Sequence, residues 1–372
     1  MRVGVDIRSL TEQRGRGVSH YAASLLESMI KSHPEDEWVL LQTGRHRYEL
    51  PPQLAQPNVR LRHVRVPNRL FNPVIGLARL PRTDRLAGRP DVFFAPNFGF
   101  LSLAGTPLVL TIHDLSFQSK PEYYTTKDRL WHRAVRTRSL AHQAKKIITV
   151  SQQTKQEVID HYQVAPDKIT VIHSGVDEQY LQPVSDGEIM AIREKYGLPK
   201  SYCLFVGALE PRKNIDSMVQ AYRLARQTGL TSELVLAGAP TSHVSQALSE
   251  PDASIHALGY IPEADKRSLY AGALVNLLVS YHEGFGFTPL EALAMGTPSI
   301  VSDLPIFAET VAEAAVTVDP SDVPGIAQNL VHLEQDPGRR NALLRRRDAI
   351  LADFSWEAAA GATYDVLSSA AV

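Results

Sequence analysis

Short runs of apolar and β-branched residues alternate along the chain with longer segments in which apolar residues recur every three to four positions. The short runs predict buried parallel strands, and the longer segments, such as the one with Tyr21, Leu25 and Met29, predict helices. This alternation is typical of α/β proteins with parallel sheets. The expected strands are Val3–Asp6, Val39–Leu41, Val92–Phe94, Leu108–Ile112, Ile147–Val150, Thr170–Ile172, Leu204–Val206, Leu234–Ala237, Ala273–Leu278, Ser299–Val301 and Val316–Val318.

The pattern divides into two doubly wound halves, residues 1–180 and 181–354, with Gly175–Gly187 as a linker because Pro183 and Ser185 separate two regular patterns. The alanine-rich end, 355–372, is expected to be helical and to pack in either half. Ligands of open parallel sheets bind beyond the carboxyl ends of the strands. Small and polar residues follow the strands in both halves, so we expect two such edges to face each other across a cleft.

The first candidate site is the segment from Tyr281 to Glu291, where a buried strand leads through a glycine-bearing turn into a helix. Gly284 and Gly286 allow close approach of the backbone, and the free N–H groups of the following helix suit a phosphate. Glu283 is a candidate acceptor for sugar hydroxyls and Glu291 for those of a ribose. The alternative for Glu291 is structural, as the partner of Thr288 in a capping box in which Pro289 is the first helical residue.

The second candidate site is Gly207–Asn214, which also connects a strand to a helix. Its adjacent cations, Arg212 and Lys213, can neutralise a diphosphate and stabilise the charge that develops on a departing phosphate. A solvated basic pair is less favourable here, because cations near a helix N-terminus oppose the dipole unless an anion joins them.

Two weaker candidates lie in the first half of the chain. Gly15 and Gly17 belong to a loop before a helix, but His20 stands where the dinucleotide fingerprint has its third glycine, so a flexible turn is an equal alternative. His113 directly follows a strand and is a candidate for contact with a sugar or for acid–base chemistry, although a single histidine at a strand end is more often structural. The sequence contains no Asp-x-Asp pair, no Walker A loop and no zinc-spaced Cys/His set.

Charge is unevenly distributed, although the formal net charge is −1. Residues 1–180 hold 25 Lys and Arg against 17 Asp and Glu, and the remainder holds 14 against 23. The residues 60–89 include many arginines and only Asp84 as an opposing charge. The ordinary interpretation is a solvated surface, and the alternative is a contact surface for anionic lipid or an anionic acceptor. No nucleic-acid recognition motif accompanies these arginines, which are Arg60, Arg62, Arg65, Arg69, Arg79, Arg82, Arg85 and Arg89.

The compartment can be predicted from three features. Cys203 is the one cysteine of the chain and lies in an apolar run, which fits a reducing cytoplasm. Asp6 lies where a signal peptide needs apolar residues. The longest uncharged run, residues 92–112, is interrupted by Pro96 and Gly105, which favours two buried strands over a membrane span. We therefore expect a cytoplasmic protein, peripheral at the inner membrane face if the arginine-rich segment contacts lipid.

Taken together, these segments resemble the family 4 retaining glycosyltransferases, especially bacterial enzymes that build polysaccharides and are often mannosyltransferases. The resemblance covers nearly the whole chain and implies the GT-B fold, two Rossmann-like domains facing across a cleft, with the C-terminal helix of residues 355–372 packing back on the first domain. Thr288 replaces a frequent proline of the family, and Ser174 replaces its usual asparagine. The matching segments are Gly15–Gly17, His113–Phe117, Ser174–Asp177, Gly207–Asn214 and the Glu-x7-Glu signature Glu283–Glu291.

The resemblance also implies roles. Glu283 would bind the donor sugar, Glu291 the ribose, and Arg212 with Lys213 the diphosphate; His113 would lie beside the transferred sugar. The donor would be a nucleotide-diphosphate sugar. GDP-mannose is the preferred candidate, and UDP-sugars and dTDP-rhamnose are alternatives. The acceptor would be a glycan or a lipid-linked saccharide, and neither a metal nor another cofactor is expected. Backbone groups near the donor would come from Gly15, Gly17, Gly286, Phe287 and Thr288.

Other functions can share this architecture. A nucleotide-sugar epimerase would convert the donor without an acceptor, and a phosphorylase would need inorganic phosphate or pyridoxal phosphate. A non-catalytic nucleotide-sugar-binding protein would bind without turnover. The combination of His113, Arg212, Lys213, Glu283 and Glu291 favours the transferase.

Overall fold

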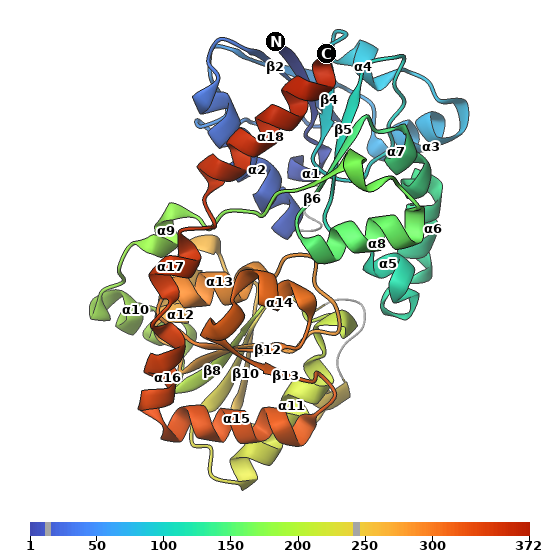
Figure 1. Ribbon diagram of the computed structural model, residues 1–372. Coiled ribbons are helices and arrows are strands. Elements are labelled where there is room, and N and C mark those ends of the chain that lie inside the picture. The colour runs from blue at the N-terminus through green and yellow to red at the C-terminus, as the bar shows by residue number, and fades with distance from the viewer. Residues whose placement is uncertain (12–15, 241–245) are drawn as a thin grey trace. The chain divides into compact units, whose positions relative to one another are not determined.

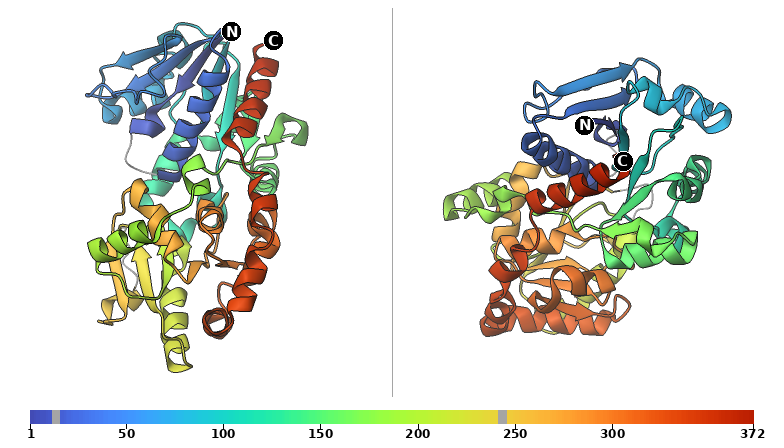
Figure 2. Two further views of the ribbon diagram at one scale, coloured as in Figure 1. Left: turned by 90° about the vertical axis from the view of Figure 1, so that its left-hand side faces the viewer. Right: turned by 45° about the horizontal axis from the view of Figure 1, so that its top comes forward.

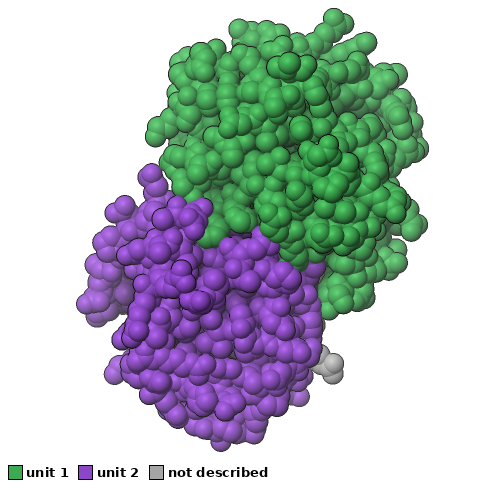
Figure 3. Space-filling view, in the orientation of Figure 1, with its two compact units in different colours: residues 1–175, 354–372 green, residues 176–353 purple. Residues whose placement is uncertain are grey.

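The computed structural model describes residues 1–11, 16–240 and 246–372. The chain forms two compact units, coloured separately in Figure 3: unit 1 is residues 1–175 with 354–372, and unit 2 is residues 176–353. The expected boundary was residue 180. The boundary between the units falls at the start of the expected linker, Gly175–Gly187, but helix α9 (Glu178–Leu181) and the start of α10 (Asp186–Tyr196) occupy much of the rest. The Ser185 and Glu188 side chains form the capping box that begins α10.

Unit 1 contains a seven-stranded sheet in the order β3-β2-β1-β4-β5-β6-β7, and every neighbouring pair is parallel. The order reverses between β1 and β4, as in a doubly wound Rossmann sheet. The uncharged run of residues 92–112 forms two buried strands with a loop, as predicted. The strands are β1 (Arg2–Asp6), β2 (Glu37–Thr43), β3 (Val59–Val64), β4 (Val92–Ala95), β5 (Leu108–Ile112), β6 (Lys146–Thr149) and β7 (Ile169–Val171).

Unit 2 repeats this plan with a six-stranded parallel sheet in the order β10-β9-β8-β11-β12-β13, and its order reverses between β8 and β11. Cys203, which lies in an apolar run of the sequence, is fully buried in β8. The strands are β8 (Tyr202–Val206), β9 (Glu233–Ala237), β10 (Ile255–Gly259), β11 (Val275–Leu278), β12 (Ser299–Ser302) and β13 (Ala315–Val318).

The sequence prediction missed β3 and β10, and both are edge strands. Central strands of a parallel sheet are buried on both faces and therefore form continuous apolar runs. In β3, by contrast, arginines and a histidine alternate with apolar residues, and most of its side chains are partly or fully exposed. β10 contains His256 and is likewise only partly buried. An analysis that searches for uniformly apolar runs does not detect such strands.

Helices cover both sheets (Figure 1). In unit 1 they are α1 (Arg8–Thr11), α2 (Arg16–Ser32), α3 (Asn68–Ala78), α4 (Thr83–Leu86), α5 (Ser116–Ser119), α6 (Thr126–Val135), α7 (Thr137–Gln143), α8 (Gln152–Tyr162) and α18 (Trp356–Ala371). The remaining helices of unit 2 are α11 (Ile215–Gln227), α12 (Glu263–Ala271), α13 (Phe287–Ala294), α14 (Pro305–Thr310), α15 (Val323–Gln335), α16 (Pro337–Leu344) and α17 (Arg347–Leu351). Among the described residues, no helix combines the length and apolar character needed to cross a membrane.

The C-terminal helix α18 packs in unit 1, beside α2 and over β4 and β5 (Figures 1 and 2). Its buried face is rich in alanine, which lets the helix approach the sheet closely. Trp356 begins the helix, and its ring lies edge-on to Tyr21 of α2. Gly175 lies against the same turn, and a Cβ there would come within 2.4 Å of the Trp356 nitrogen. The close passage of this backbone explains the glycine of the Ser174–Asp177 segment.

Candidate functional site

The main candidate site lies in unit 2, where the strand order reverses. β8 and β11 are neighbours there, and the loops that leave their carboxyl ends are the two segments selected from the sequence. The loops are joined directly: the Tyr281 N–H donates to the Arg212 carbonyl at 3.0 Å, and the Asn214 side chain donates to the Val279 carbonyl at 3.0 Å. The reversal of strand order therefore brings together residues about seventy positions apart.

Glu283 is buried and receives both cations of the other loop. Lys213 Nζ lies 2.5 Å from Oε1, and an Arg212 nitrogen lies 3.2 Å from Oε2. The Ser280 hydroxyl also donates to Oε1, at 2.7 Å. Both carboxylate oxygens are therefore engaged, and the side chain is held in one orientation.

Electrostatics fix the charge state of this group. Burial alone would raise the pKa of Glu283, but the adjacent Lys213 and Arg212 charges and the Ser280 hydrogen bond lower it to about 2. Glu283 is therefore a carboxylate at neutral pH. A carboxylate that is stabilised to this degree is a good hydrogen-bond acceptor and a poor proton carrier.

Arg212 is held by more than Glu283. It donates to the His282 carbonyl at 2.7 Å and to Glu210 Oε1 at 2.7 Å. Glu210 lies in the Gly207–Asn214 segment, but the sequence by itself assigns it no role. The anion expected for these two cations is a bound diphosphate, and that contact stays a prediction; within the protein, Glu283 and Glu210 pair with them. The ion pairs form a chain, Glu210–Arg212–Glu283–Lys213, which holds both cations in fixed positions.

The glycine loop before α13 has a conformation that requires glycine. Gly286 has φ +79°, and a Cβ there would lie 2.7 Å from the Phe307 ring. The helix begins directly after it, at Phe287, with Gly286 as N-cap. The predicted capping box of Thr288 and Glu291 is therefore wrong, because the left-handed glycine turns the chain into the helix earlier than expected.

Glu291 is buried in a separate polar cluster. Its Oε2 accepts a hydrogen bond from the Tyr270 hydroxyl at 2.8 Å. Burial, with the nearby Glu291 charge, raises the pKa of Tyr270 well above its ordinary value, so this phenol stays protonated and remains a donor. Tyr180 lies beside Tyr270 and donates to Glu263 at 2.6 Å. Neither tyrosine was selected from the sequence, because an isolated tyrosine in a helix carries no motif.

Thr288 lies in the first turn of α13, which carries N–H groups without intrahelical acceptors. Its Oγ1 is buried, and no described residue forms a hydrogen bond with it. Buried hydroxyl groups nearly always have a partner in folded proteins. This atom is therefore a candidate contact for a ligand at the helix start.

His113 follows β5 in unit 1 and is half-buried. Its Nε2 lies 2.8 Å from the Pro96 carbonyl, which can only accept, so Nε2 carries the proton. The ring packs edge-on against Tyr21 at 4.7 Å between centroids. Burial lowers the pKa of His113 below its ordinary value, although the Pro96 contact and Asp114 oppose the shift. The neutral ring therefore presents Nδ1 as a hydrogen-bond acceptor.

The glycine loop of unit 1 is described only in part. Gly15 lies outside the described residues. Gly17 is exposed in the first turn of α2, and a Cβ there would meet no atom within 4 Å. Packing within the described residues therefore does not require glycine at position 17, and its contact with a ligand stays a prediction.

An ion pair at the end of β1 was missed. Arg8 donates from Nε and from a terminal nitrogen to the two oxygens of Asp6, at 2.8 and 2.5 Å, and both residues are buried. Arg8 also donates to the Phe100 carbonyl at 3.1 Å. The sequence placed Asp6 at the strand end but not its partner two residues on, because only the turn into α1 folds the arginine back.

Comparison with known proteins gives the family. Residues 15–180 match the model of Glycosyltransferase Family 4, and residues 189–347 match that of Glycosyl transferases group 1. The O-antigen chain mannosyltransferase B of Escherichia coli is 33% identical over 273 residues, which are 72% of this chain and 71% of that protein. The chain belongs to glycosyltransferase family 4. It is accordingly a glycosyltransferase, and family 4 membership sets the epimerase, phosphorylase and non-catalytic alternatives aside.

Solved structures agree on the fold. Sucrose-phosphate synthase from Thermosynechococcus elongatus superposes with a TM-score of 0.74 at 20% identity, covering 100% of both chains. The Anabaena protein Alr3699/HepE in complex with UDP and glucose gives 0.73 at 18% identity, covering 99% of this chain and 100% of that one. The family 4 chain therefore has the expected GT-B type of fold, with two parallel α/β domains.

Proposed function

We propose that this glycosyltransferase moves a hexose from a nucleotide-diphosphate sugar to a glycan or lipid-linked saccharide. The preferred donor in this proposal is GDP-mannose. The transfer retains the anomeric configuration and needs no metal ion. The observation that carries the proposal is the network of Arg212, Lys213 and Glu283 at the strand-order reversal of unit 2. The start of α13 lies on the same loop, so fixed cations, helix N–H groups and a carboxylate are available to one ligand.

The cations suit the diphosphate of the donor. When the sugar–phosphate bond breaks, negative charge grows on the leaving phosphate, and fixed positive charges lower the energy of that state. Arg212 and Lys213 are each held by a buried carboxylate before any donor binds. They are therefore positioned in advance, and little reorganisation accompanies the reaction.

Glu283 orients the sugar rather than attacking it. Lys213 and Ser280 engage its Oε1, and Arg212 engages its Oε2. The two cations, the Ser280 hydroxyl and a pKa of about 2 make this carboxylate a weak nucleophile, whereas its negative charge makes it a good acceptor for a sugar hydroxyl. This supports a retaining mechanism in which the acceptor attacks from the face of the leaving group and the departing phosphate takes the acceptor's proton.

Arg212 and Lys213 supply the positive charge that a metal gives to other glycosyltransferases. The sequence has no Asp-x-Asp pair, which is the usual metal–diphosphate ligand of those enzymes. The two carboxylates nearest the cations, Glu210 and Glu283, are already paired with Arg212. Binding a divalent cation there would require breaking these ion pairs.

The remaining candidate residues have roles in this proposal. Glu291 accepts from a ribose hydroxyl, and the backbone of Gly286, Phe287 and Thr288 contacts the diphosphate, with the buried Thr288 hydroxyl as an additional donor. His113 offers Nδ1 to a sugar hydroxyl. Its lowered pKa keeps this atom unprotonated at neutral pH, which favours an acceptor role over general-acid chemistry.

Relatives support the donor assignment to different degrees. The Escherichia coli relative is by name a mannosyltransferase of O-antigen chains, which supports mannose as the sugar and a polysaccharide as the product. The solved HepE complex holds UDP and glucose, so UDP-sugars remain the alternative donors. GDP is the nucleotide diphosphate that we test first.

Peripheral contact with an anionic membrane is a further part of the proposal. Leu70, Val74 and Leu77 form one stripe of α3 and are 58%, 50% and 84% exposed. Arg69 of α3 and Arg79 at its end are exposed and form no ion pair within the described residues, whereas Arg60 pairs with Glu37 and Arg82 is half-buried. Asp84, the one acid of residues 60–89, is buried and accepts from the Arg85 and Ala104 N–H groups. An exposed apolar stripe flanked by unopposed arginines is typical of a surface that binds anionic lipid.

A thermal-shift panel tests the donor site. GDP, UDP, dTDP and ADP are each added with excess EDTA, and a ligand at about one hundred times its Kd adds about 2.7 kcal/mol to stability. We expect GDP to raise the melting temperature without metal. No shift with any of the four, followed by no hydrolysis of any donor sugar, would contradict the proposal. The anomeric configuration of the isolated product, read by NMR, tests retention.

A further inference from the structure

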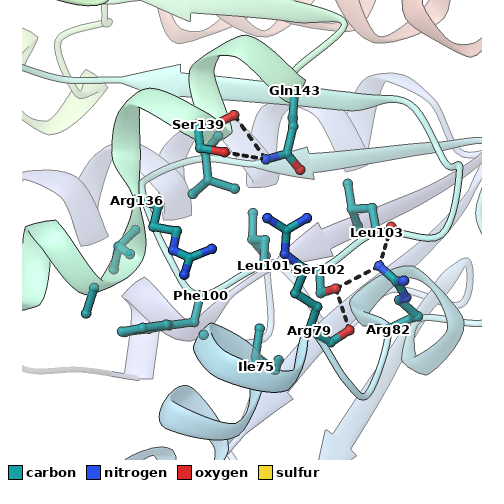
Figure 4. Close-up of a pocket in the computed structure, with 14 residues that line it drawn as sticks. Ile75, Arg79, Arg82, Phe100, Leu101, Ser102, Leu103, Arg136, Ser139 and Gln143 are labelled. Atoms are coloured by element: carbon teal, nitrogen blue, oxygen red, sulfur yellow. Dashed lines mark hydrogen bonds between the residues drawn. The ribbon is translucent and has the colours of Figure 1, made fainter.

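Unit 1 contains a basic cavity that the donor site does not use. Its volume is about 110 Å³, where one water needs about 10–15 Å³ by the same measure. Arg79 and Arg82 line it from the chain after α3, Arg136 from the junction of α6 and α7, and the segment Phe100–Leu103 from the loop after β4 (Figure 4). None of the residues that line the cavity is acidic.

One of the three arginines is held in place by the cavity wall. Arg82 donates to the Ser102 hydroxyl and to the Leu103 carbonyl, both at 3.1 Å. The Ser102 hydroxyl in turn donates to the Arg79 carbonyl at 2.7 Å. The Arg82 guanidinium is therefore fixed by neutral acceptors, and its charge is not cancelled.

The other two guanidinium groups, of Arg79 and Arg136, both extend into the cavity (Figure 4). Within the described part of the chain, the Arg79 and Arg136 guanidinium groups have neither an acidic partner nor a hydrogen bond to a protein group. Arg79 and Arg136 are both exposed, so solvent screens part of their repulsion, but two like charges that face one space still favour an anion there. An anion in the cavity would relieve the repulsion and could accept from several N–H donors at once.

Backbone conformation sets the direction of the Arg79 and Arg136 side chains. Arg79 and Arg136 end helices α3 and α6 in the left-handed region, with φ of +53° and +58°. Glycine is the usual residue at such helix ends, because a Cβ is strained there. Arg89 and Gln163 share this left-handed conformation outside the cavity, so it fixes the direction in which Arg79 and Arg136 leave the backbone and is not itself a sign of a ligand.

The surroundings extend the positive surface. A second groove, of about 700 Å³, shares Arg136 and Ser139 with the cavity, and no acidic residue lines it. Its other cations are Arg129, Arg133 and Arg138. The same loop that reaches the cavity at Phe100 contacts His113 through the Pro96 carbonyl. The cavity is therefore connected through one loop to a residue selected for substrate contact.

We infer that the cavity formed by Arg79, Arg82 and Arg136 binds the phosphate or diphosphate group of an organic ester. Guanidinium groups pair with phosphate oxygens in a bidentate manner, and three of them around a space of this size match a phosphate better than a single carboxylate. The ester is carried either by a membrane lipid or by a water-soluble substrate, and the chemistry recognised is the same in both. The inference is independent of the donor proposal, because it concerns unit 1 alone.

The first experiment reads each arginine separately. Protein labelled with 15N-arginine is titrated with inorganic pyrophosphate, and the Nε–H resonances of Arg79 and Arg136 are assigned by their loss in R79Q and R136Q. We expect both resonances to shift and saturate together, while that of Arg89 stays in place. Arg89 is a matched control, since it is exposed, has φ +56° and lines neither cavity. Unmoved Arg79 and Arg136 resonances overturn the inference, whatever Arg212 of the donor site does.

The second experiment distinguishes a membrane lipid from a water-soluble substrate as the carrier of the phosphate ester. Pyrophosphate affinity and binding to phosphatidylcholine vesicles, with and without phosphatidylglycerol, are compared between R79Q/R136Q and R89Q. We expect pyrophosphate affinity to fall about tenfold or more in the double variant only. A parallel loss of phosphatidylglycerol-dependent vesicle binding identifies a lipid phosphate, and unchanged vesicle binding identifies a soluble ester. Equal pyrophosphate affinity in the two variants overturns the inference.

Discussion

Lys213 Nζ lies 2.5 Å from Glu283 Oε1 and joins two loops that are seventy residues apart in the sequence. β8 and β11 precede these loops and are neighbours only because the strand order of unit 2 reverses between them. The cations and the carboxylate of the candidate donor site are therefore one charge network, whereas the sequence presents them as separate motifs. Changing Arg212, Lys213 or Glu283 therefore alters the charge balance around the other two residues.

Replacing the Glu283 carboxylate with the amide of Gln should reduce kcat/KM for transfer by about ten- to a hundredfold, because a hydrogen bond to a charged acceptor contributes about 1.5–3 kcal/mol. Binding of the free nucleotide diphosphate should stay nearly intact, since Lys213 and Arg212 remain. Calorimetry with GDP and steady-state kinetics measure the two quantities. The matched control is E313Q, an exposed carboxylate of the same unit. Normal turnover in E283Q would refute the assignment of Glu283 to the sugar.

Acid should destabilise unit 2 through the same carboxylate. The Glu283 pKa is depressed from 4.5 to about 2 in the folded protein, so the unfolded chain binds the proton more tightly. The resulting stabilisation is complete above about pH 4.5 and is lost as the pH falls toward 2. A shift of this size corresponds to about 3 kcal/mol.

Cys203 provides the measurement for this prediction. It is buried in unit 2, so its reaction with 4,4′-dithiodipyridine during urea unfolding reports on that unit. The stability difference between wild type and E283Q should shrink between pH 4.5 and 2. A difference that stays constant over this range would show that Glu283 gains no stability from its ionised form.

Glu291→Gln should weaken binding of GDP more than binding of 2′-deoxy-GDP, because only the ribonucleotide has the hydroxyl that the proposal pairs with this carboxylate. A loss of about tenfold for GDP is expected from one charged hydrogen bond. Y270F is the comparison variant, since it removes the Tyr270 donor to Glu291 but leaves the carboxylate in place. If E291Q weakens both nucleotides equally, Glu291 supports the fold of the site and does not contact the ribose.

Gly175→Ala should destabilise unit 1 by about 1–3 kcal/mol, the usual cost of overpacking. A Cβ at this position would lie 2.4 Å from the Trp356 nitrogen and 2.8 Å from the Ser355 carbonyl carbon, and backbone atoms cannot rotate away. Gly361→Ala on the same helix α18 is the control, because a Cβ there meets nothing within 4 Å. It should be neutral or stabilise the helix by up to about 1 kcal/mol.

Tryptophan fluorescence follows this comparison in urea. Trp38, Trp131 and Trp356 are the three tryptophans of the chain, and all lie in unit 1, so the signal reports on that unit. Equal stability of the Gly175 and Gly361 variants would mean that α18 can move away from residue 175 at little cost.

The central strands could be predicted from the sequence because both of their faces are buried, which produces continuous apolar runs such as Leu108–Ile112. The edge strands β3 and β10 could not, because half of their side chains meet solvent and the apolar run is broken. The residues of the donor site could also be selected, since glycines, adjacent cations and carboxylates follow strands at one edge of a sheet. Their roles in binding and transfer stay predictions until the variants are measured.

The sequence by itself determined the α/β class, the core strands and which residues follow them, because these depend on periodicity within one segment. Only the tertiary structure decided which of those residues meet. It paired Lys213 with Glu283, replaced the expected capping box of Thr288 and Glu291 by a left-handed Gly286, and brought Arg136 to Arg79 and Arg82. Each of these contacts joins distant segments or depends on a backbone angle set by packing, and neither property is encoded in the local pattern of apolar and polar residues.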